Sequence, residues 1–191
     1  MSVPLRVALL YGSTREGRTG DQVVAWAAEQ IRRDDRFELD VIDPLDHDLP
    51  AHFPAGEHEG MAQLTERLQQ ADAILIATPE YNHSFPAPLK QVIDLTGEAW
   101  QARPVAFISY GGVSGGLRAV EQLRQVFAEL HAVTLRQVVS FMNVWQSFDK
   151  TGTLQNPARA NQRLATLLTQ LQWWARTLRQ GREQQPYGAI L

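Results

Sequence analysis

The sequence predicts an α/β protein built on an open, doubly wound parallel sheet of five strands, with helices on both faces. Two observations predict this class. Short apolar runs alternate, about five times, with segments whose apolar residues recur at helical spacing, which is typical of parallel sheets. The chain has 191 residues, too few for a typical eight-fold barrel of the same alternating elements.

Five segments are predicted to be strands. The run Ala73–Ala77 is apolar on both faces, as expected of a parallel strand covered by helices on both sides. The segment Phe37–Ile42 instead alternates apolar and polar residues, which indicates a strand nearer the sheet edge. In chain order the predicted strands are Leu5–Tyr11, Phe37–Ile42, Ala73–Ala77, Val105–Ser109 and Thr134–Phe141.

Each predicted strand is followed by an amphipathic segment, except that the second is followed first by a long loop. The stretch Asp43–Gly60 is rich in Pro, His and Asp, so it is predicted to be irregular. Elsewhere apolar residues recur every three or four positions, which predicts helices. The predicted helices are Gly20–Arg32, Met61–Ala71, Leu89–Thr96, Leu117–Leu130 and Leu164–Trp174.

Composition limits the partners and the location. The net charge is −3, which does not favour nucleic acid as a partner. No apolar run approaches the roughly 20 residues that cross a bilayer, and no signal-peptide pattern is present. We therefore expect a cytoplasmic protein without a membrane partner. Because there is neither an internal repeat nor a linker, residues 1–180 are predicted to form a single domain and residues 181–191 a C-terminal tail.

The chain contains no cysteine. This excludes disulfides, thiolate metal sites and cysteine nucleophiles. If the protein transfers electrons, a bound cofactor must carry them. His47, His52 and His58 lie in an acidic loop, but their spacing matches no common metal-binding pattern, so no metal site is predicted.

The loop after the first strand, YGSTREGRTG, is rich in groups that bind anions. Glycines allow backbone N–H groups to approach a ligand closely, and the following helix directs its positive end to the same place. Arginine side chains match phosphate oxygens with two parallel donors. The candidate phosphate-binding side chains are those of Ser13, Thr14, Arg15, Arg18 and Thr19.

The same loop fits, with one substitution, the nucleotide-triphosphate spacing G-x-x-x-x-G-K-[ST]. Arg18 replaces the lysine of that motif, and arginine prefers bidentate contact with one phosphate. Asp43 is the only candidate for the acidic partner of Mg²⁺, and it follows a weaker strand. A site for a terminal monophosphate is therefore favoured over a site for a triphosphate.

The loops after the third and fourth strands differ in character. Residues 78–88 contain three prolines, together with Tyr81 and Phe85, and a rigid loop with aromatic and amide groups suits a planar heterocycle. Residues 109–116 contain four glycines, so that backbone can approach a ligand closely.

These loops adjoin at the switch point if the strand order is 2-1-3-4-5. A phosphate site beside a platform for a ring describes a mononucleotide site. In a chain without cysteine, flavin mononucleotide (FMN) would explain the layout.

Three motifs at these strand ends resemble those of a known family. They are Gly12-Ser13-x-Arg15, Pro79-Glu80-Tyr81-Asn82 and Tyr110-Gly111-Gly112-x-x-Gly115-Gly116. Together they resemble the NADPH-dependent FMN reductase family, flavodoxin-like flavoproteins that include quinone, azo-dye and chromate reductases. The resemblance spans about Arg6 to Phe141, and Pro79–Asn82 is its most specific element.

The resemblance implies a flavodoxin-like fold and an FMN-dependent NAD(P)H oxidoreductase. Hydride would pass from NADPH or NADH to flavin N5, followed by two-electron reduction of a quinone, an azo compound or free flavin. It also implies a homodimer or homotetramer, with the helix from Pro88 to about Gly97 at the dimer face. No residue is assigned as a catalytic acid or base.

The resemblance also implies positions for the cofactor. The FMN phosphate would lie on the loop after the first strand, and the isoalloxazine ring would rest against Pro79–Asn82. The Gly-rich loop would line the other side of the ring. Family members with a plainer first loop carry Ser where Arg18 stands. The implied cofactor-binding residues are Ser13, Arg15, Arg18, Thr19, Pro79, Glu80, Tyr81, Asn82, Ser109, Gly111, Gly112, Ser114 and Gly115.

Two other functions remain open from the sequence. One is a flavodoxin-type electron-transfer module that serves a partner protein, against which Arg15, Arg18 and the modest net charge argue. The other, less favoured, is a P-loop nucleotide hydrolase, which would require Mg²⁺-dependent ATP or GTP binding.

Overall fold

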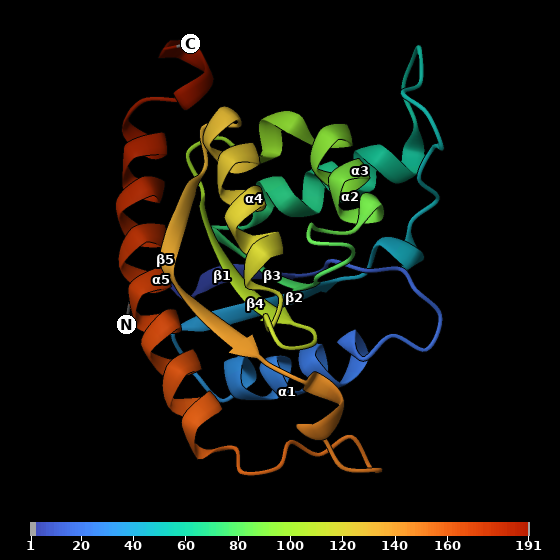
Figure 1. Ribbon diagram of the computed structural model, residues 1–191. Coiled ribbons are helices and arrows are strands. Elements are labelled where there is room, and N and C mark those ends of the chain that lie inside the picture. The colour runs from blue at the N-terminus through green and yellow to red at the C-terminus, as the bar shows by residue number, and fades with distance from the viewer. Residues whose placement is uncertain (1–2, 191) are drawn as a thin grey trace.

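The computed structural model describes residues 3–190 and contains one sheet of five parallel strands, in the order β2-β1-β3-β4-β5 (Figure 1). The predicted class and strand order are confirmed. The strands are β1 (Leu5–Tyr11), β2 (Phe37–Ile42), β3 (Ala73–Pro79), β4 (Pro104–Tyr110) and β5 (Val133–Phe141). The α-helices are α1 (Gly20–Arg32), α2 (Glu59–Gln70), α3 (Ala87–Leu95), α4 (Leu117–Glu129) and α5 (Ala158–Gln184).

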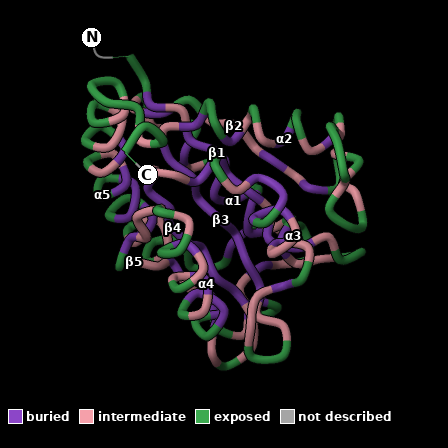
Figure 2. Tube along the Cα trace, turned by 90° about the horizontal axis from the view of Figure 1, so that it is seen from above, coloured by how far each residue is buried: buried purple, intermediate pink, exposed green. Residues whose placement is uncertain are grey.

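Helices cover both faces of the sheet, so that the strands are enclosed in the buried centre of the molecule (Figures 1 and 2). Alternate residues of a strand point to opposite faces. On β1, Leu9 packs with side chains of α1 and α5, whereas Leu10 packs with side chains of α2, α3 and α4. Every residue of β3 is buried, as the apolar run Ala73–Ala77 predicts.

Short 3₁₀ helices complete the connections. The loop predicted over Asp43–Gly60 is mostly irregular, but a 3₁₀ turn follows β2 directly and α2 begins at Glu59. Three further turns follow α3, β5 and α5. In chain order the 3₁₀ helices are η1 (Pro44–Asp46), η2 (Gly97–Trp100), η3 (Val144–Gln146) and η4 (Tyr187–Ile190).

The two outer strands are irregular or charged. The pairing of β4 with β5 shifts register between Val105 and Phe107, which marks a bulge. On the opposite edge, β2 carries exposed Glu38 and the partly buried Asp40, whose carboxylate accepts hydrogen bonds from Arg67. Neither edge is a flat apolar ribbon.

The last helix is longer than predicted, because α5 begins at Ala158 and continues to Gln184. The tail predicted to begin at residue 181 therefore starts within the last turn of α5. The η4 turn then returns to the body of the molecule, where the hydroxyl of Tyr187 lies 3.1 Å from Nδ1 of His131. Residues 1, 2 and 191 lie outside the described residues. Within residues 3–190, no helix combines the length and hydropathy needed to cross a membrane.

Candidate functional site

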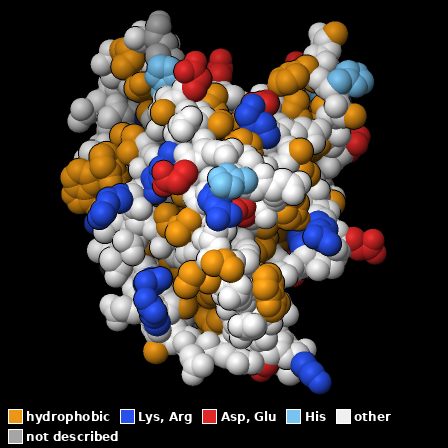
Figure 3. All heavy atoms as spheres, in the orientation of Figure 1, with side chains coloured by type: hydrophobic (Ala, Val, Ile, Leu, Met, Phe, Trp, Pro, Cys, Tyr) orange, Lys and Arg blue, Asp and Glu red, His pale blue; other side chains and the backbone are white. Residues whose placement is uncertain are grey.

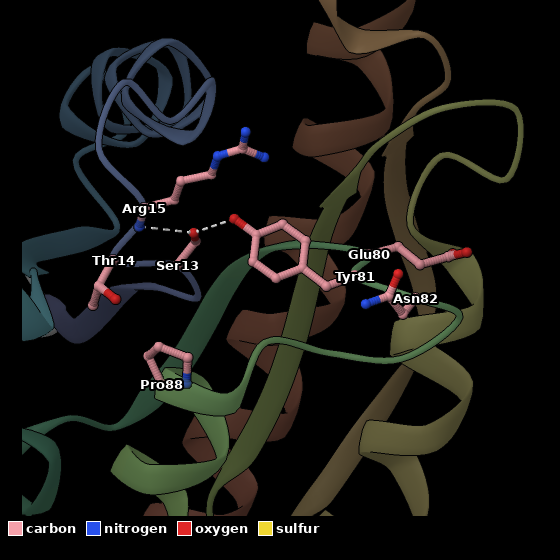
Figure 4. A pocket seen from close by; sticks show the side chains of 7 residues that line it. All are labelled: Ser13, Thr14, Arg15, Glu80, Tyr81, Asn82 and Pro88. Carbon is pink, nitrogen blue, oxygen red and sulfur yellow. Dashed lines mark hydrogen bonds between the residues drawn. The ribbon is translucent and has the colours of Figure 1, made fainter. Parts of the chain in front are cut away.

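Two adjoining cavities lie beyond the carboxyl ends of β1, β3 and β4, where strand order reverses. Their volumes are about 460 and 410 Å³. Arg15, Glu80 and Tyr81 line both, so the two are halves of one hollow. Figure 4 shows the first cavity, which is completed by Ser13, Thr14, Asn82 and Pro88. The second is completed by Glu16, Gly17, Arg18, Thr19, Pro79, Tyr110, Gly111, Gly112, Val144 and Trp145.

The loop after β1 is packed closely on the neighbouring strand. The Gly12 N–H donates to the carbonyl of Ala77 at 2.8 Å, and a Cβ on Gly12 would lie 2.9 Å from that oxygen. Glycine is therefore required for this approach. The next residue, Ser13, is buried, and its Oγ accepts from the Arg15 N–H and lies 2.8 Å from the Tyr81 hydroxyl. Ser13 thus connects the first loop to the loop after β3 (Figure 4).

The guanidinium of Arg18 makes hydrogen bonds to other groups of the protein. It donates to both carboxylate oxygens of Asp43, to Asp21 and to the carbonyl of Ser13, and it lies 4.0 Å from the centroid of the Tyr11 ring. Four of the five N–H donors of an arginine are thereby used. The Arg18 side chain is only 8% exposed. Its position fixes the loop after β1 against the end of β2.

The same cluster sets the ionisation of Asp43. Burial by itself raises the pKa of the Asp43 carboxyl, but hydrogen bonds from Arg18 and from the Leu45 N–H outweigh burial, and the pKa lies below its ordinary value. Asp43 is therefore a charged partner of Arg18. It was the only acidic residue that the nucleotide-hydrolase hypothesis offered for Mg²⁺.

Arg15 differs from Arg18, three residues away. Arg15 is exposed and lines both cavities. Within residues 3–190 its guanidinium makes no hydrogen bond or ion pair, and only its backbone N–H is engaged, with Ser13. Arg15 is thus the arginine of this loop that is available to an anion.

The loop after β3 is a tight hairpin. Tyr81 and Ser84 exchange backbone hydrogen bonds of 2.8 and 3.0 Å. The two residues between them, Asn82 and His83, have φ angles of 49° and 72°, as in a turn of type I′. This turn directs the Tyr81 side chain back toward Ser13, across the hollow (Figure 4).

Glu80 joins this hairpin to the Gly-rich loop. Its carboxylate accepts hydrogen bonds from the Ser114 hydroxyl at 2.7 Å and from the N–H and guanidinium of Arg118. Burial raises the pKa of Glu80, but these hydrogen bonds outweigh that effect and hold the pKa below its ordinary value. The hairpin is therefore fixed to the start of α4.

The Gly-rich loop is held by its backbone. The hydroxyls of Ser109 and Ser140 both donate to the carbonyl of Gly115, at 2.7 and 2.9 Å. Gly111 and Gly112 line the second cavity, whereas Ser109, Ser114 and Gly115 line neither cavity. Cofactor contacts of these three residues stay a prediction, and their observed bonds fix the shape of the loop.

Two aromatic residues in the second cavity were not among the predicted site residues. Tyr110 is 4% exposed, and burial raises the pKa of its phenol. A Cβ on Gly20 would lie 2.5 Å from the Tyr110 hydroxyl, so a glycine at the start of α1 makes room for it. Trp145, on η3, is exposed at the rim. Tyr110 could have been predicted as a site residue, because it begins the Tyr110-Gly111-Gly112 motif. Nothing in the sequence distinguishes Trp145 from the other tryptophans.

The structure also bears on helix α3, predicted at a dimer face, and on possible metal-binding groups. In α3, the residues Leu89, Val92 and Ile93 are fully buried in the core, so only the opposite side of that helix is available to another subunit. In the described part of the chain no cluster of three or more His, Asp or Glu side chains could hold a metal ion.

The sequence profile of the NADPH-dependent FMN reductase family matches residues 5–146. The chain belongs to this family. It is 32% identical to an NAD(P)H:quinone oxidoreductase of Solanum tuberosum over 184 residues, which covers 88% of this chain and 91% of the relative. It is 28% identical to an NAD(P)H-dependent FMN reductase of Pseudomonas aeruginosa, over 94% of this chain and all of the relative.

Solved structures agree in fold with this FMN reductase family member. The flavoenzyme FerB of Paracoccus denitrificans, an NAD(P)H:(acceptor) oxidoreductase, superposes with a TM-score of 0.73 at 22% identity, over 91% of this chain and 98% of FerB. A flavodoxin of Pseudomonas aeruginosa gives a TM-score of 0.59 at 20% identity, over 87% of this chain and 99% of the flavodoxin. The flavodoxin-like fold class is confirmed.

Membership confirms the predicted class of enzyme, an NAD(P)H-dependent oxidoreductase that acts with FMN. The two other functions left open by the sequence are not favoured. The nucleotide-hydrolase hypothesis also loses its magnesium ligand, because Asp43 is bound to Arg18.

Proposed function

We propose that the two cavities together bind one FMN and that the protein uses it to pass two electrons from NAD(P)H to a quinone-like acceptor. The observation that carries this proposal is the hollow at the ends of β1, β3 and β4, in which a free arginine lies beside a backbone platform. A hollow that combines aromatic side chains, backbone N–H groups and a few polar side chains suits a phosphorylated planar ligand.

The residues present fit FMN. Among the described residues no side chain pairs with the Arg15 guanidinium, and Ser13, Thr14 and Thr19 line the same hollow, so these four residues supply donors for a phosphate. Arg18 is proposed to act mainly by holding this loop in shape, since one N–H donor remains for the ligand after its bonds to Asp21, Asp43 and Ser13.

The platform for the ring is proposed to be the hairpin and the Gly-rich loop. Pro79, Glu80 and Tyr81 line the second cavity together with Gly111 and Gly112, and Asn82 lines the first. Backbone N–H groups of these segments can hydrogen-bond a heterocycle, and such donors stabilise negative charge that develops on it. Ser109, Ser114 and Gly115 are proposed to support this platform through the bonds described above.

When bound, FMN supplies the redox chemistry, by accepting a hydride from the nicotinamide and returning two electrons to the acceptor. The protein contributes position and exclusion of water. The overall reaction balances with one proton: NAD(P)H, a proton and a quinone give NAD(P)⁺ and a hydroquinone. No side chain in the hollow is required as a proton donor, because the quinol oxygens can take protons from solvent.

A visible absorption spectrum tests this function. The purified protein is incubated with FMN, desalted, and then mixed with NADPH or NADH without oxygen. We expect a retained flavin spectrum that bleaches, and that recovers when a naphthoquinone is added. A retained spectrum that neither nucleotide bleaches would assign the chain to electron transfer for a partner protein instead. Failure to bind saturating FMN, measured by titration, would overturn the proposal.

Acceptor choice is tested in the same assay. We propose quinones first, because the curated relatives include quinone oxidoreductases, with azo compounds and free flavin as further acceptors. Initial rates with a naphthoquinone, an azo dye and excess FMN rank the three classes. If the quinone were the slowest of the three, the proposed acceptor class would be wrong.

We also propose that the protein works as a homodimer or homotetramer. Three large apolar side chains near the hollow support this, since Val113, Leu117 and Met142 are 83%, 45% and 65% exposed. Exposed apolar side chains that gather in one place are characteristic of contact surfaces. Light scattering on the FMN-loaded protein would show one species of two or four chains, and a monomer would contradict the proposal.

A further inference from the structure

Trp145 is an exposed indole in the wall of the second cavity. Its side chain is 63% exposed. It lines that cavity together with Tyr110, Gly111 and Gly112. Figure 3 shows hydrophobic side chains gathered on this face, over the Gly-rich loop and the segment that follows β5. The ring of a tryptophan exposed at the rim of a ligand site is available to stack against a bound ligand.

Backbone hydrogen bonds hold the segment before Trp145 against the Gly-rich loop. Asn143, with φ at 46°, turns the chain sharply after β5, and its N–H donates to the Gly112 carbonyl at 3.0 Å. The Val144 N–H donates to the Gly111 carbonyl, also at 3.0 Å. The Val144 side chain is 3% exposed and lies in the core, so Trp145 follows an anchored residue. The backbone that carries Trp145 is therefore held close to the Gly-rich loop.

Gly112 leaves the indole open. A Cβ placed on Gly112 would lie 3.7 Å from Cη2 of Trp145, which is ordinary van der Waals contact. The indole thus packs against the backbone of the loop, and no side chain at position 112 covers it. The indole and Tyr81 both line the second cavity, whose volume is about 410 Å³.

Trp173 provides a comparison. It is 61% exposed, almost the same as Trp145, but it lies on α5 and packs edge-to-face against Trp174 at a centroid distance of 5.0 Å. Trp173 lines neither of the two cavities. Exposure alone therefore does not distinguish Trp145, whereas its fixed position in the wall of the hollow does.

We propose that Trp145 is the aromatic outer wall of the FMN site and contacts the isoalloxazine ring. This inference rests on the proposed function, because it requires FMN in the hollow. Contact between an indole and a flat heterocycle is favourable through dispersion and loss of water-exposed apolar surface. Because the contact involves the ring and not the phosphate, loss of Trp145 should weaken binding equally for flavins with and without the phosphate.

The test compares four variants with the wild type: W145A, W145F, R15A and the matched control W173A. The dissociation constants of FMN and of riboflavin, which lacks the phosphate, are measured by calorimetric titration of the apo form of the full chain. We expect W145A to weaken FMN and riboflavin by the same factor, about tenfold, because aromatic stacking is worth that much. W145F should lose at most about threefold, since a smaller ring remains.

The other two variants separate the contributions. W173A should leave both constants unchanged. R15A should weaken FMN but not riboflavin, which checks that the titration distinguishes phosphate from ring. Thermal unfolding of each apo variant should match the wild type, because Trp145 and Trp173 are both largely exposed.

Two outcomes would overturn the inference. One is a W145A protein that binds FMN within about twofold of the wild type, and the other is a W145F protein that loses as much as W145A. If the first outcome came with a smaller assembly by light scattering, Trp145 would be assigned to a subunit contact instead. Absence of FMN binding by the wild type would overturn the proposed function as well, so the two failures are distinguishable.

Discussion

The loops after β1 and β4 both line the second cavity, but they differ in what holds them in shape. The first is held by side chains, through Arg18 with Asp43 and Ser13 with Tyr81. The Gly-rich loop, besides the hydrogen bonds of its serines, depends on close backbone packing, since Gly116 packs directly on the backbone of Tyr110. We therefore expect truncation of a side chain to destabilise the first loop, and addition of a side chain to destabilise the Gly-rich loop.

The largest expected effect comes from adding atoms to the Gly-rich loop. Gly116 has φ at 79°, and a Cβ there would lie 2.8 Å from the Tyr110 nitrogen and 2.9 Å from its carbonyl oxygen. We expect Gly116→Ala to lower the free energy of unfolding by about 3 kcal/mol, from strain and overpacking together. Urea unfolding measures this change.

Gly17→Ala is the matched control. Gly17 also has a positive φ, 64°, but nothing lies within 4 Å of a Cβ there. Only the conformational strain remains, about 1 kcal/mol. Equal losses in the two variants would show that close packing does not fix the Gly-rich loop.

The next effect comes from removing charge from the first loop. Arg18→Ala leaves the carboxylate of Asp43, whose side chain is 16% exposed, without its main partner. We expect a loss of about 2 kcal/mol in the free energy of unfolding, because a mostly buried charge is left unpaired. The control is Arg33→Ala, whose partner Glu29 is 58% exposed and whose loss should be below about 0.5 kcal/mol. Similar values for both would refute a structural role for Arg18.

The pH dependence of this pair has a definite sign. The pKa of Asp43 is lowered in the folded protein, so its stabilising effect is complete above the unfolded value of about 3.9 and is lost as the pH falls through the folded value. The unfolding free energies of the wild type and of Asp43→Asn should therefore differ most at neutral pH and converge as the pH falls below the ordinary aspartate value of about 3.9. Chemical unfolding at several pH values measures both, and a gap that widens in acid would be the wrong sign.

The smallest effect concerns the link between the first loop and the hairpin. Tyr81→Phe removes the hydroxyl that lies 2.8 Å from Oγ of Ser13. A double-mutant cycle with Ser13→Ala should give a coupling free energy of about 1 kcal/mol, typical of one neutral hydrogen bond. Additive effects would mean that the two loops are held independently.

The sequence is sufficient for the architecture because its signals are local. The apolar run Ala73–Ala77 needs no partner to indicate a central strand, and the observed β3 extends it only to Pro79. The extent of α5 is different. The residues of α5 are mostly polar outside its centre, so only Leu164–Trp174 shows apolar residues at clear helical spacing. The observed helix begins earlier, at Ala158.

The site is less predictable because the roles of its residues depend on distant partners. Arg15 and Arg18 have the same side chain, yet Asp43 binds only Arg18. Asp43 is 25 residues beyond Arg18 in the sequence, and β2 brings it to this loop. From the sequence, the Ser114 hydroxyl is a candidate ligand for the cofactor. In the fold, this hydroxyl donates a hydrogen bond of 2.7 Å to the Glu80 carboxylate. Trp145 reaches the hollow because Asn143 turns the chain there. Such pairings are set by tertiary structure.

The two edges of the sheet constrain how copies of this protein can meet. An unpaired strand is a template for a strand from another molecule, and bulges and charges suppress that pairing. The bulged β5 and the charged β2 therefore disfavour growth of the sheet from chain to chain. We therefore expect contacts between copies of this protein to involve helices and loops rather than the edges of the sheet.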